Sequence, residues 1–408
     1  MVALPAGAAD AVLGVAPRLT VEPASVDEAA EVMRACAGDG LALLFGGGGT
    51  DLELGAPPRE LDVLLRTRRL ARVVEHAPAD QIATVEAGMP IAALQQHLAA
   101  HRQRLALDPP LPLRATIGGV VAANAFGPRR LRYGAARDLV VGMSFVRADG
   151  TPARGGGKVV KNVAGFDVPR LLVGSLGTLA LITTVTVRLH PLPETETTVL
   201  VPGLSAASLR PLVKALAEAQ LEPTSAAAIA EGAHLRLGVR FEGFAPGVAE
   251  QRDRLLALAE RVGASAEPLE DGDARGFWER HDNIRSEGSL RARISAPAAS
   301  VALVQERVIA PLAAALRPAA AVLYPMLGFA FVSGEPAHVD AVVRAVEDGR
   351  AALAPLGGSV VLTAAPLAVR ARADVWGAPP TSLALMRRMK EALDPRGRLA
   401  PGRFVGGL

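Results

Sequence analysis

Residues 115–191 read ATIGGVVAANAFGPRRLRYGAARDLVVGMSFVRADGTPARGGGKVVKNVAGFDVPRLLVGSLGTLALITTVTVRLHP, and they decide how we interpret the rest of the chain. Clusters of glycine separate short apolar runs. The stretch also holds Lys158 and Lys161, two of the four lysines of the chain, and Asn124 and Asn162, two of its three asparagines. Compact donors thus lie beside backbone that a ligand can approach closely. We interpret the stretch as part of a ligand site, with chance placement as the alternative.

Composition indicates a globular protein of about two domains. The chain has 408 residues, of which 50% are hydrophobic and 21% are charged, so each domain can bury its own core. The formal net charge is only +3, and aromatic residues make up 3%. Because basic residues are neither clustered nor interleaved with aromatic ones, the sequence argues against a nucleic-acid interface.

Cysteine and histidine usage argues against bound metal. Cys36 is the only cysteine, which excludes an intrachain disulfide, a Cys-ligated iron–sulfur cluster and a Cys-based zinc site. The seven histidines show no HExxH or HxH spacing. His97 and His101 share a helical face, but no third ligand is near them in the sequence, so we expect a solvated face and no metal.

The sequence predicts a cytoplasmic protein. The opening residues, MVALPAGAADAVLGVAP, lack a basic leader, and no uncharged apolar run reaches the roughly 18 residues of a membrane span. Attachment to the inner face of a membrane through a partner remains open.

Another glycine-rich segment lies earlier in the chain than residues 115–191. Ser25 and Glu28 form a capping box that predicts a helix ending at Gly38 or Gly40. The apolar strand 41–45 then leads into Gly46, Gly47, Gly48, Gly49, Thr50 and Asp51. A turn needs only one or two residues with positive φ, so four consecutive glycines predict a loop whose N–H groups converge on an anion. A flexible linker is the alternative. The pattern is neither a Walker motif nor GxGxxG.

Hydrophobic periodicity predicts the remaining elements. In the first half we expect strands at 82–88, 139–147 and 181–189, a helix at 91–101, and a boundary at 191–193. In the second half we expect helices at 205–220, 248–262, 299–316 and from 337, with strands at 234–241, 291–295, within 321–332 and at 359–363. This order predicts an antiparallel sheet with helices on one face, near the ferredoxin-like plan. Residues 381–404 form a final helix and an extended segment.

The two glycine loops, about 70 residues apart, can enclose one elongated anion such as a pyrophosphate cofactor. The segment 17–193 resembles the FAD-binding domain of the vanillyl-alcohol oxidase (PCMH) type. Residues 46–51 match its pyrophosphate loop, 116–119 with 122–124 match its second contact, and 174–178 with Ile182 match its late GSxGTLxxI element. Within that superfamily, GGKVVKNVAGFD and ALDPRGRLAPGRF resemble the FAD-binding E subunits of bacterial glycolate oxidases.

The resemblance implies an α+β fold, with a two-lobed PCMH-type FAD-binding domain followed by a ferredoxin-like antiparallel-sheet cap domain. It implies an extension at 1–16, the FAD domain at 17–193, the cap at 194–373 and a tail at 374–408 that returns to the FAD domain. No histidine lies beside the glycine loop, so we expect non-covalent FAD. The cofactor-binding residues implied are Gly46, Gly47, Gly48, Gly49, Thr50, Asp51, Pro109, Thr116, Ile117, Gly118, Gly119, Ala122, Asn124, Lys161, Asn162, Gly165, Asp167, Gly177, Thr178 and Ile182.

The catalytic residues are less defined. Lys161 either stabilises the reduced flavin or lies in a surface loop, and Asp167 pairs with Lys161 or with an arginine. Arg291 and Arg293 are weak candidates for binding a substrate carboxylate. Phe45 replaces an arginine that often precedes the glycines in the family.

The second half lacks the HxGDGN and EEHG motifs of the catalytic D-2-hydroxyacid dehydrogenases. His234 and His281 are isolated, and no histidine–carboxylate pair has a spacing that would assemble a base for substrate oxidation. The resemblance implies an FAD subunit of a glycolate oxidase (2-hydroxyacid dehydrogenase) complex, which passes electrons to an iron–sulfur subunit beside a second FAD subunit. The alternatives are a self-sufficient dehydrogenase of another small hydroxyacid or alcohol, and a non-catalytic scaffold.

Overall fold

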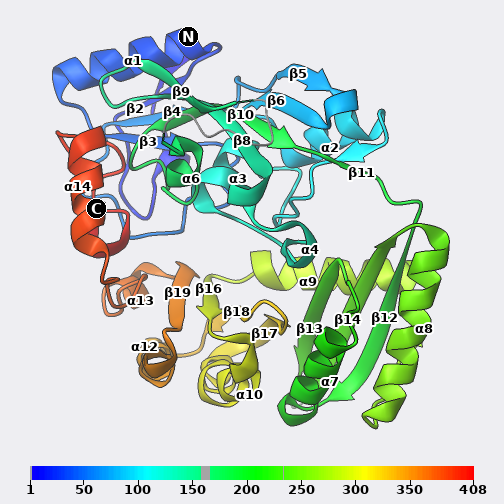
Figure 1. The fold of residues 1–408 in the computed structure, drawn as a ribbon. Coiled ribbons are helices and arrows are strands. Elements are labelled where there is room, and N and C mark those ends of the chain that lie inside the picture. The colour runs from blue at the N-terminus through cyan, green and yellow to red at the C-terminus, as the bar shows by residue number, and fades with distance from the viewer. Residues whose placement is uncertain (1, 158–165, 233) are drawn as a thin grey trace. The chain divides into compact units, whose positions relative to one another are not determined.

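The computed structural model describes residues 2–157, 166–232 and 234–408, and the chain separates into two compact units. The first unit contains Met1–Gly127, Gly134–Leu192 and Ala378–Leu408 (Figure 1). The second contains Pro128–Tyr133 and Pro193–Gly377. In the described parts of the chain, no helix has both the length and the apolar character that crossing a membrane requires.

A small sheet of four strands begins the first unit, in the order β1-β2-β4-β3. The strands are β1 (Val2–Pro5), β2 (Leu19–Glu22), β3 (Leu43–Gly46) and β4 (Val63–Arg66). Helix α1 (Val26–Asp39) begins at Ser25, whose Oγ accepts a hydrogen bond from Glu28 N at 3.1 Å, as the sequence predicted. The buried face of α1, including Met33 and Cys36, packs against the apolar residues of β3 and β4.

The second sheet of this unit is antiparallel, in the order β5-β6-β10-β8-β9. Its strands are β5 (Val73–Ala77), β6 (Ile82–Glu86), β8 (Val140–Val146), β9 (Pro152–Gly156) and β10 (Leu181–Arg188). The central strand β10 is buried on both sides, which explains its continuous apolar and threonine-rich sequence. The strands predicted from residues 82, 139 and 181 onward are present.

Shorter elements complete the first unit. They are α2 (Ile91–Ala99), α3 (Ile117–Ala123), α5 (Ala136–Leu139), α6 (Val168–Leu172), α14 (Leu383–Leu393) and the paired strands β7 (Gln103–Arg104) and β11 (His190–Pro191). Helix α3 begins at Thr116 and ends at Asn124, which has a left-handed backbone conformation.

The second unit is built on one antiparallel sheet of eight strands, in the order β15-β12-β14-β13-β17-β18-β16-β19. The strands are β12 (Thr195–Leu204), β13 (Ser225–Glu231), β14 (His234–Gly243), β15 (Glu267–Pro268), β16 (Leu290–Ser295), β17 (Leu316–Tyr324), β18 (Phe329–Pro336) and β19 (Ser359–Ala364). Each half has the ferredoxin-like order, and β13 pairs with β17 to join the halves. The predicted α+β architecture is confirmed, and the ferredoxin-like plan occurs twice within this sheet.

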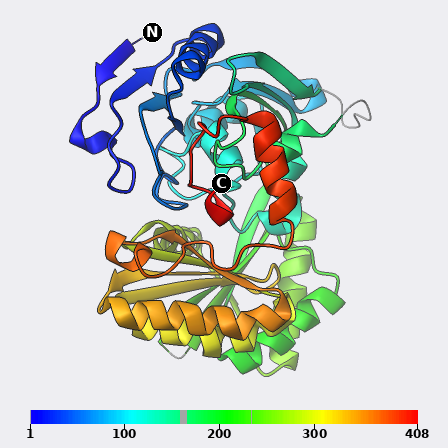
Figure 2. The ribbon, with the colours of Figure 1, turned by 90° about the vertical axis from the view of Figure 1, so that its left-hand side faces the viewer.

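The helices of the second unit are α4 (Arg130–Tyr133), α7 (Ala206–Glu218), α8 (Ala245–Arg261), α9 (Asp271–Ser286), α10 (Val301–Val304), α11 (Ala310–Ala314), α12 (Val339–Leu353) and α13 (Leu367–Arg370). Figure 2 shows α12 along one face of the sheet. A π-helical stretch, Gln305–Ile309, joins α10 to α11, so the helix predicted at 299–316 is nearly continuous.

Helix α9 corrects the expectation that helices cover a single face. Val301 and Val304 of α10 line a small apolar pocket with Ile294 and Ala330. Helix α9 instead contacts Thr198, to whose Oγ1 the Trp278 Nε1 group donates at 3.1 Å. The strand pairings place Thr198 on the face of Phe331, which is opposite to that of Ala330. Gly238 makes room for this helix, since a Cβ there would lie 2.4 Å from Phe277. We therefore conclude that α9 packs on the other face.

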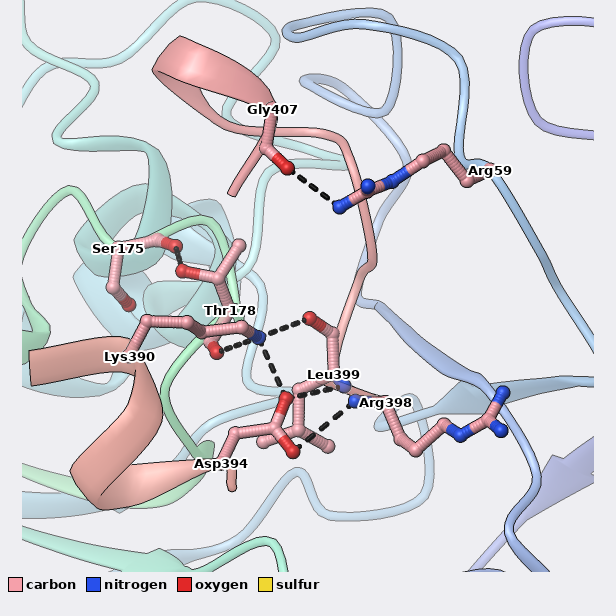
Figure 3. Close-up of polar contacts among 8 residues, drawn as sticks. All are labelled: Arg59, Ser175, Thr178, Lys390, Asp394, Arg398, Leu399 and Gly407. Carbon is pink, nitrogen blue, oxygen red and sulfur yellow. Dashed lines mark hydrogen bonds and ion pairs between the residues drawn. The ribbon is translucent and has the colours of Figure 1, made fainter. Parts of the chain in front are cut away.

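The carboxyl-terminal segment extends the first sheet beside β3. Leu399 forms a parallel bridge with Leu43. Leu43 N donates to Arg398 O at 2.8 Å, and Ala400 N donates to Leu43 O at 2.7 Å. Arg59 donates to Gly407 O at 2.6 Å and fixes the end of the chain (Figure 3). Strand β3 is thus held between β4 and the tail.

Lys390 of α14 anchors this tail. Its ammonium group donates to Thr178 O at 2.7 Å, to Asp394 Oδ2 at 2.6 Å and to Leu399 O at 2.7 Å (Figure 3). The side chains of Lys390 and Asp394 are only 9% and 1% exposed. Burial lowers the pKa of Lys390 from its usual value, while the hydrogen bond to Asp394 opposes that shift. Three acceptors therefore compensate one buried charge.

We predict that Lys390→Met lowers the free energy of unfolding by about 3 kcal/mol or more, because it leaves the Asp394 carboxylate buried without its cation. Lys214→Met is the matched control, since Lys214 forms the same i, i+4 ion pair with Glu218 but the two side chains are 73% and 65% exposed. Its effect should stay within about 0.5 kcal/mol. Urea unfolding of both variants measures the difference, and equal losses would contradict the assigned role.

Candidate functional site

A cleft in the first unit gathers residues from six separate parts of the chain. It contains about 760 Å³ of empty space, including the part open to solvent. Its walls are Leu44, Phe45, Gly46, Gly47, Gly48, Gly49, Thr50, Asp51, Leu52, Thr67, Ala87, Thr116, Gly118, Gly119, Ala122, Ala123, Leu176, Gly177, Ala180, Leu181, Ile182 and Arg403. Both glycine-rich stretches that the sequence singled out thus meet at one cleft.

The first glycines of the loop after β3 allow two chain segments to approach closely. A Cβ at Gly47 would lie 2.1 Å from Thr116 Oγ1, and a Cβ at Gly48 would lie 1.6 Å from Arg114 O. Gly49 has φ +79°, which favours glycine for a different reason. The loop is therefore pressed against the segment that opens α3, and side chains are excluded from that contact.

Glycines also shape the opposite wall. A Cβ at Gly118 would lie 2.6 Å from Ala87 Cβ, so this glycine lets α3 pack on the end of β6. Gly177 has φ +72°, and a Cβ there would lie 2.8 Å from Phe45 Cδ2. Phe45, which stands where the family often has arginine, therefore packs under the late glycine turn.

The loop presents backbone donors to the cleft. Within the described residues, no hydrogen bond uses the N–H groups of Gly47, Gly48, Gly49 or Thr50. The Thr50 hydroxyl donates to Asp51 Oδ2 at 3.2 Å. Successive N–H groups without internal partners, at the wall of a cleft, are the donor set that a pyrophosphate requires. The residues present therefore fit the phosphate part of a dinucleotide cofactor.

Arg403 is a cleft residue that the sequence did not single out. It is 3% exposed, and its guanidinium donates to Leu52 O at 2.8 Å and to Leu54 O at 2.6 Å. It thereby fixes the chain that follows the glycine loop. The only signal for it was the GRF ending of the carboxyl-terminal motif.

The cleft brings together most of the predicted cofactor residues. Those that line it are Gly46, Gly47, Gly48, Gly49, Thr50, Asp51, Thr116, Gly118, Gly119, Ala122, Gly177 and Ile182. Lys161, Asn162 and Gly165 lie outside the residues that the structure describes. The predicted contacts of these three residues with the cofactor therefore stay predictions.

Five predicted residues lie away from the cleft walls. Pro109 and Ile117 are buried. Asn124 ends α3, and its buried Oδ1 has no hydrogen-bond partner in the described chain. Asp167 caps α6 and forms an ion pair with Arg170 at 3.0 Å, so its partner among the described residues is an arginine. The Thr178 hydroxyl donates to Ser175 O at 2.7 Å.

Arg291 and Arg293 are in the second unit, on β16. Arg293 pairs with Phe331 and Arg291 with Ser333 across the antiparallel ladder, so the two arginines share the face of Phe331. Arg291 Nη1 donates to Ser286 O at 2.6 Å, which ties β16 to the end of α9.

His281, which the sequence left isolated, pairs with the neighbouring carboxylate of Asp282. His281 Nδ1 lies 2.9 Å from Asp282 Oδ1, and its Nε2 lies 2.7 Å from Tyr324 OH. Neighbouring helical residues rarely face each other, which is why the sequence did not suggest this pair. His281 is 1% exposed, and burial lowers its pKa below the usual value. It is therefore a neutral, buried link between α9 and β17 and has no solvent-accessible nitrogen for substrate.

Comparisons with known proteins agree with this geometry. Residues 17–156 match the FAD binding domain family, and residues 377–404 match the C-terminal domain of FAD linked oxidases. The chain is 29% identical to an FAD-linked oxidoreductase of Mycobacterium tuberculosis, with 96% of this chain and 91% of the relative covered.

Two further relatives cover only parts of both chains. The D-lactate dehydrogenase of Archaeoglobus fulgidus is 36% identical over 46% of this chain and 43% of its own length. The glycolate oxidase subunit GlcE of Escherichia coli is 33% identical over 45% of this chain and 51% of its own length.

Solved structures share the whole fold. Alkyldihydroxyacetonephosphate synthase and p-cresol methylhydroxylase have TM-scores of 0.74 and 0.72 over 95% of this chain, covering 78% and 88% of theirs, at 17% identity. The fold is thus that of the PCMH type. The protein is an FAD-linked oxidoreductase, and its cofactor is FAD.

We predict that Gly48→Ala destabilises the loop by about 1–3 kcal/mol, because the new methyl group must displace backbone. The purified variant should also contain less FAD per chain than wild type. Gly46→Ala is the control for stability, since a Cβ at this position would lie 3.5 Å from Leu64, which is an ordinary contact. The flavin-free Gly46→Ala variant should have the melting temperature of the flavin-free wild type. Thermal unfolding and flavin absorbance test this, and wild-type values for Gly48→Ala would refute it.

Proposed function

We propose that this protein is the FAD-binding subunit of a glycolate oxidase-type complex, which oxidises a small 2-hydroxyacid and passes the electrons to an iron–sulfur partner subunit. The cleft carries the proposal, because the glycine loop, α3 and the carboxyl-terminal Arg403 meet there in one cofactor site. The similarity to GlcE and to a D-lactate dehydrogenase supports the substrate class.

In this proposal the N–H groups of Gly47, Gly48, Gly49 and Thr50 bind the pyrophosphate of FAD. Gly118 and Gly119 leave room for the cofactor beside α3, and Ile182 contributes an apolar contact on the opposite wall. FAD, when bound, accepts two electrons from a substrate and releases them singly to an acceptor. The protein supplies binding, orientation and exclusion of water.

The need for a partner follows from the cysteine content. A Cys-ligated iron–sulfur cluster requires several thiolates, and this chain has only Cys36. Cys36 lies on the buried face of α1, and burial raises its pKa to about 11. The one-electron acceptor in this proposal is therefore carried by another polypeptide, beside a second FAD subunit.

One observation favours a second candidate, a self-sufficient dehydrogenase for a carboxylic acid. Arg285 lies 4.8 Å from the Phe331 ring centroid, and Arg291 and Arg293 share the face of Phe331. Guanidinium groups beside aromatic rings are suited to bind a carboxylate. In the part of the second unit that the structure describes, His281 is enclosed and is no accessible base beside these arginines, which argues for the complex.

Anaerobic reduction distinguishes the candidates. We expect glycolate or D-lactate to bleach the visible flavin absorbance of this chain only in the presence of its partner subunits. A complex assembled with the Gly48→Ala variant is the control. The variant is expected to lower the FAD content of this chain and to leave the FAD of the partner subunit unchanged. Bleaching of the isolated wild-type chain would favour the self-sufficient enzyme, and a chain purified without any flavin would favour the scaffold.

We also predict that FAD is bound without a covalent link. The residues that line the cleft in the described chain include no histidine, cysteine or tyrosine able to bond the flavin. Precipitation with acid should therefore release all yellow colour into the supernatant. Colour that stays in the protein pellet would show a covalent bond and contradict the prediction.

A further inference from the structure

Three histidines that are distant in the sequence meet on the surface of the first unit. His97 and His101 lie on and just after α2, and His76 lies on the neighbouring strand β5. The ring centroids of His76 are 5.3 Å from His97 and 4.8 Å from His101, and those of His97 and His101 are 6.3 Å apart. The fold thus places a third imidazole, that of His76, beside His97 and His101. The sequence around these two residues contains no third ligand.

A hydrogen-bond chain fixes the tautomer of His76. Gln103 Nε2 donates to Pro78 O at 2.7 Å, so the amide oxygen of Gln103 must face His76. That oxygen lies 2.9 Å from His76 Nε2 and can only accept, so Nε2 carries the proton of the neutral ring. The other nitrogen, Nδ1, is then a bare lone pair. It is buried and has no hydrogen-bond partner in the described chain.

This arrangement has the chemistry of a metal ligand with its supporting residue. Metal-binding histidines usually donate their second ring N–H to a carbonyl or carboxylate, as His76 does to Gln103. A buried acceptor without a partner is costly, and a metal ion would satisfy it. The separations are also suitable, because imidazoles on one tetrahedral zinc ion, with Zn–N bonds of about 2.0–2.1 Å, have ring centroids roughly 5 Å apart.

We propose that His76, His97 and His101 form a binding site for one divalent transition-metal ion, with zinc the best fit, and that the fourth position is open to water. In the present rotamers the three rings pack against one another, and the described parts of the chain contain no group of three histidine, cysteine, aspartate or glutamate side chains placed to hold a metal ion. His97 and His101 are exposed, so their side chains can rotate toward His76 Nδ1 at little cost. The ion would link β5 to α2 and stabilise this edge of the unit.

The test uses the full chain with FAD bound, freed of metal with a chelator and titrated with ZnCl₂ by calorimetry. We expect one ion per chain. His76→Phe keeps the ring packing but removes both nitrogens, and it should weaken binding at least about tenfold, as should His97→Gln and His101→Gln. His338→Ala, an exposed histidine of the second unit, is the control and should leave binding unchanged.

The result for His76 decides between this site and an ordinary helical pair. If His97→Gln and His101→Gln weaken binding but His76→Phe does not, only the i, i+4 pair binds and the proposal is wrong. Zinc affinity no greater than that of a variant lacking all three histidines would also overturn it. A second readout needs no variant: cobalt(II) added to the wild-type chain should give the intense visible bands of four-coordinate metal, and weak six-coordinate bands would refute the site.

Discussion

The buried ammonium group of Lys390 holds the cofactor cleft together. It donates to Thr178 O, next to the glycine turn of one wall, and to Leu399 O, in the tail that pairs with the strand leading into the glycine loop. One charge therefore connects two walls that are more than a hundred residues apart in the chain. An ammonium group suits this position because its three donors point in different directions, whereas a guanidinium group is planar. Asp394 balances the charge and also accepts from Leu399 N at 2.8 Å.

The glycine loop combines two requirements that the sequence could not separate. Gly47 and Gly48 are needed because the chain passes so close to Thr116 and Arg114 that no side chain fits. The N–H groups of the same residues make no hydrogen bond within the described chain. Close packing of the backbone on one side thus leaves its donors available on the other. Replacing either glycine would disturb both the close backbone contact and the anion site. Packing alone therefore requires glycine at these two positions, even before a ligand binds.

Local signals predicted much of the fold. The capping box at Ser25 and the apolar runs of β6, β8 and β10 gave the correct element types. Strand β13 was missed because its sequence, SAAAIAE, is rich in alanine, which has low strand propensity, and only the sheet on both sides stabilises it. Helix α9 was missed although Phe277, His281 and Ile284 are spaced for one face, since charged residues dominate the segment.

The cofactor side of the protein was easier to predict than the rest for a physical reason. A site made of backbone N–H groups needs glycines in sequence order, and glycine clusters are visible in a sequence. The His281–Tyr324 contact and the cluster of His76, His97 and His101 depend instead on which strands and helices become neighbours. The same holds for Arg403, whose carbonyl partners lie some 350 residues earlier in the chain. Sites of this second kind leave no local pattern in the sequence, because only the fold brings together the residues that form them.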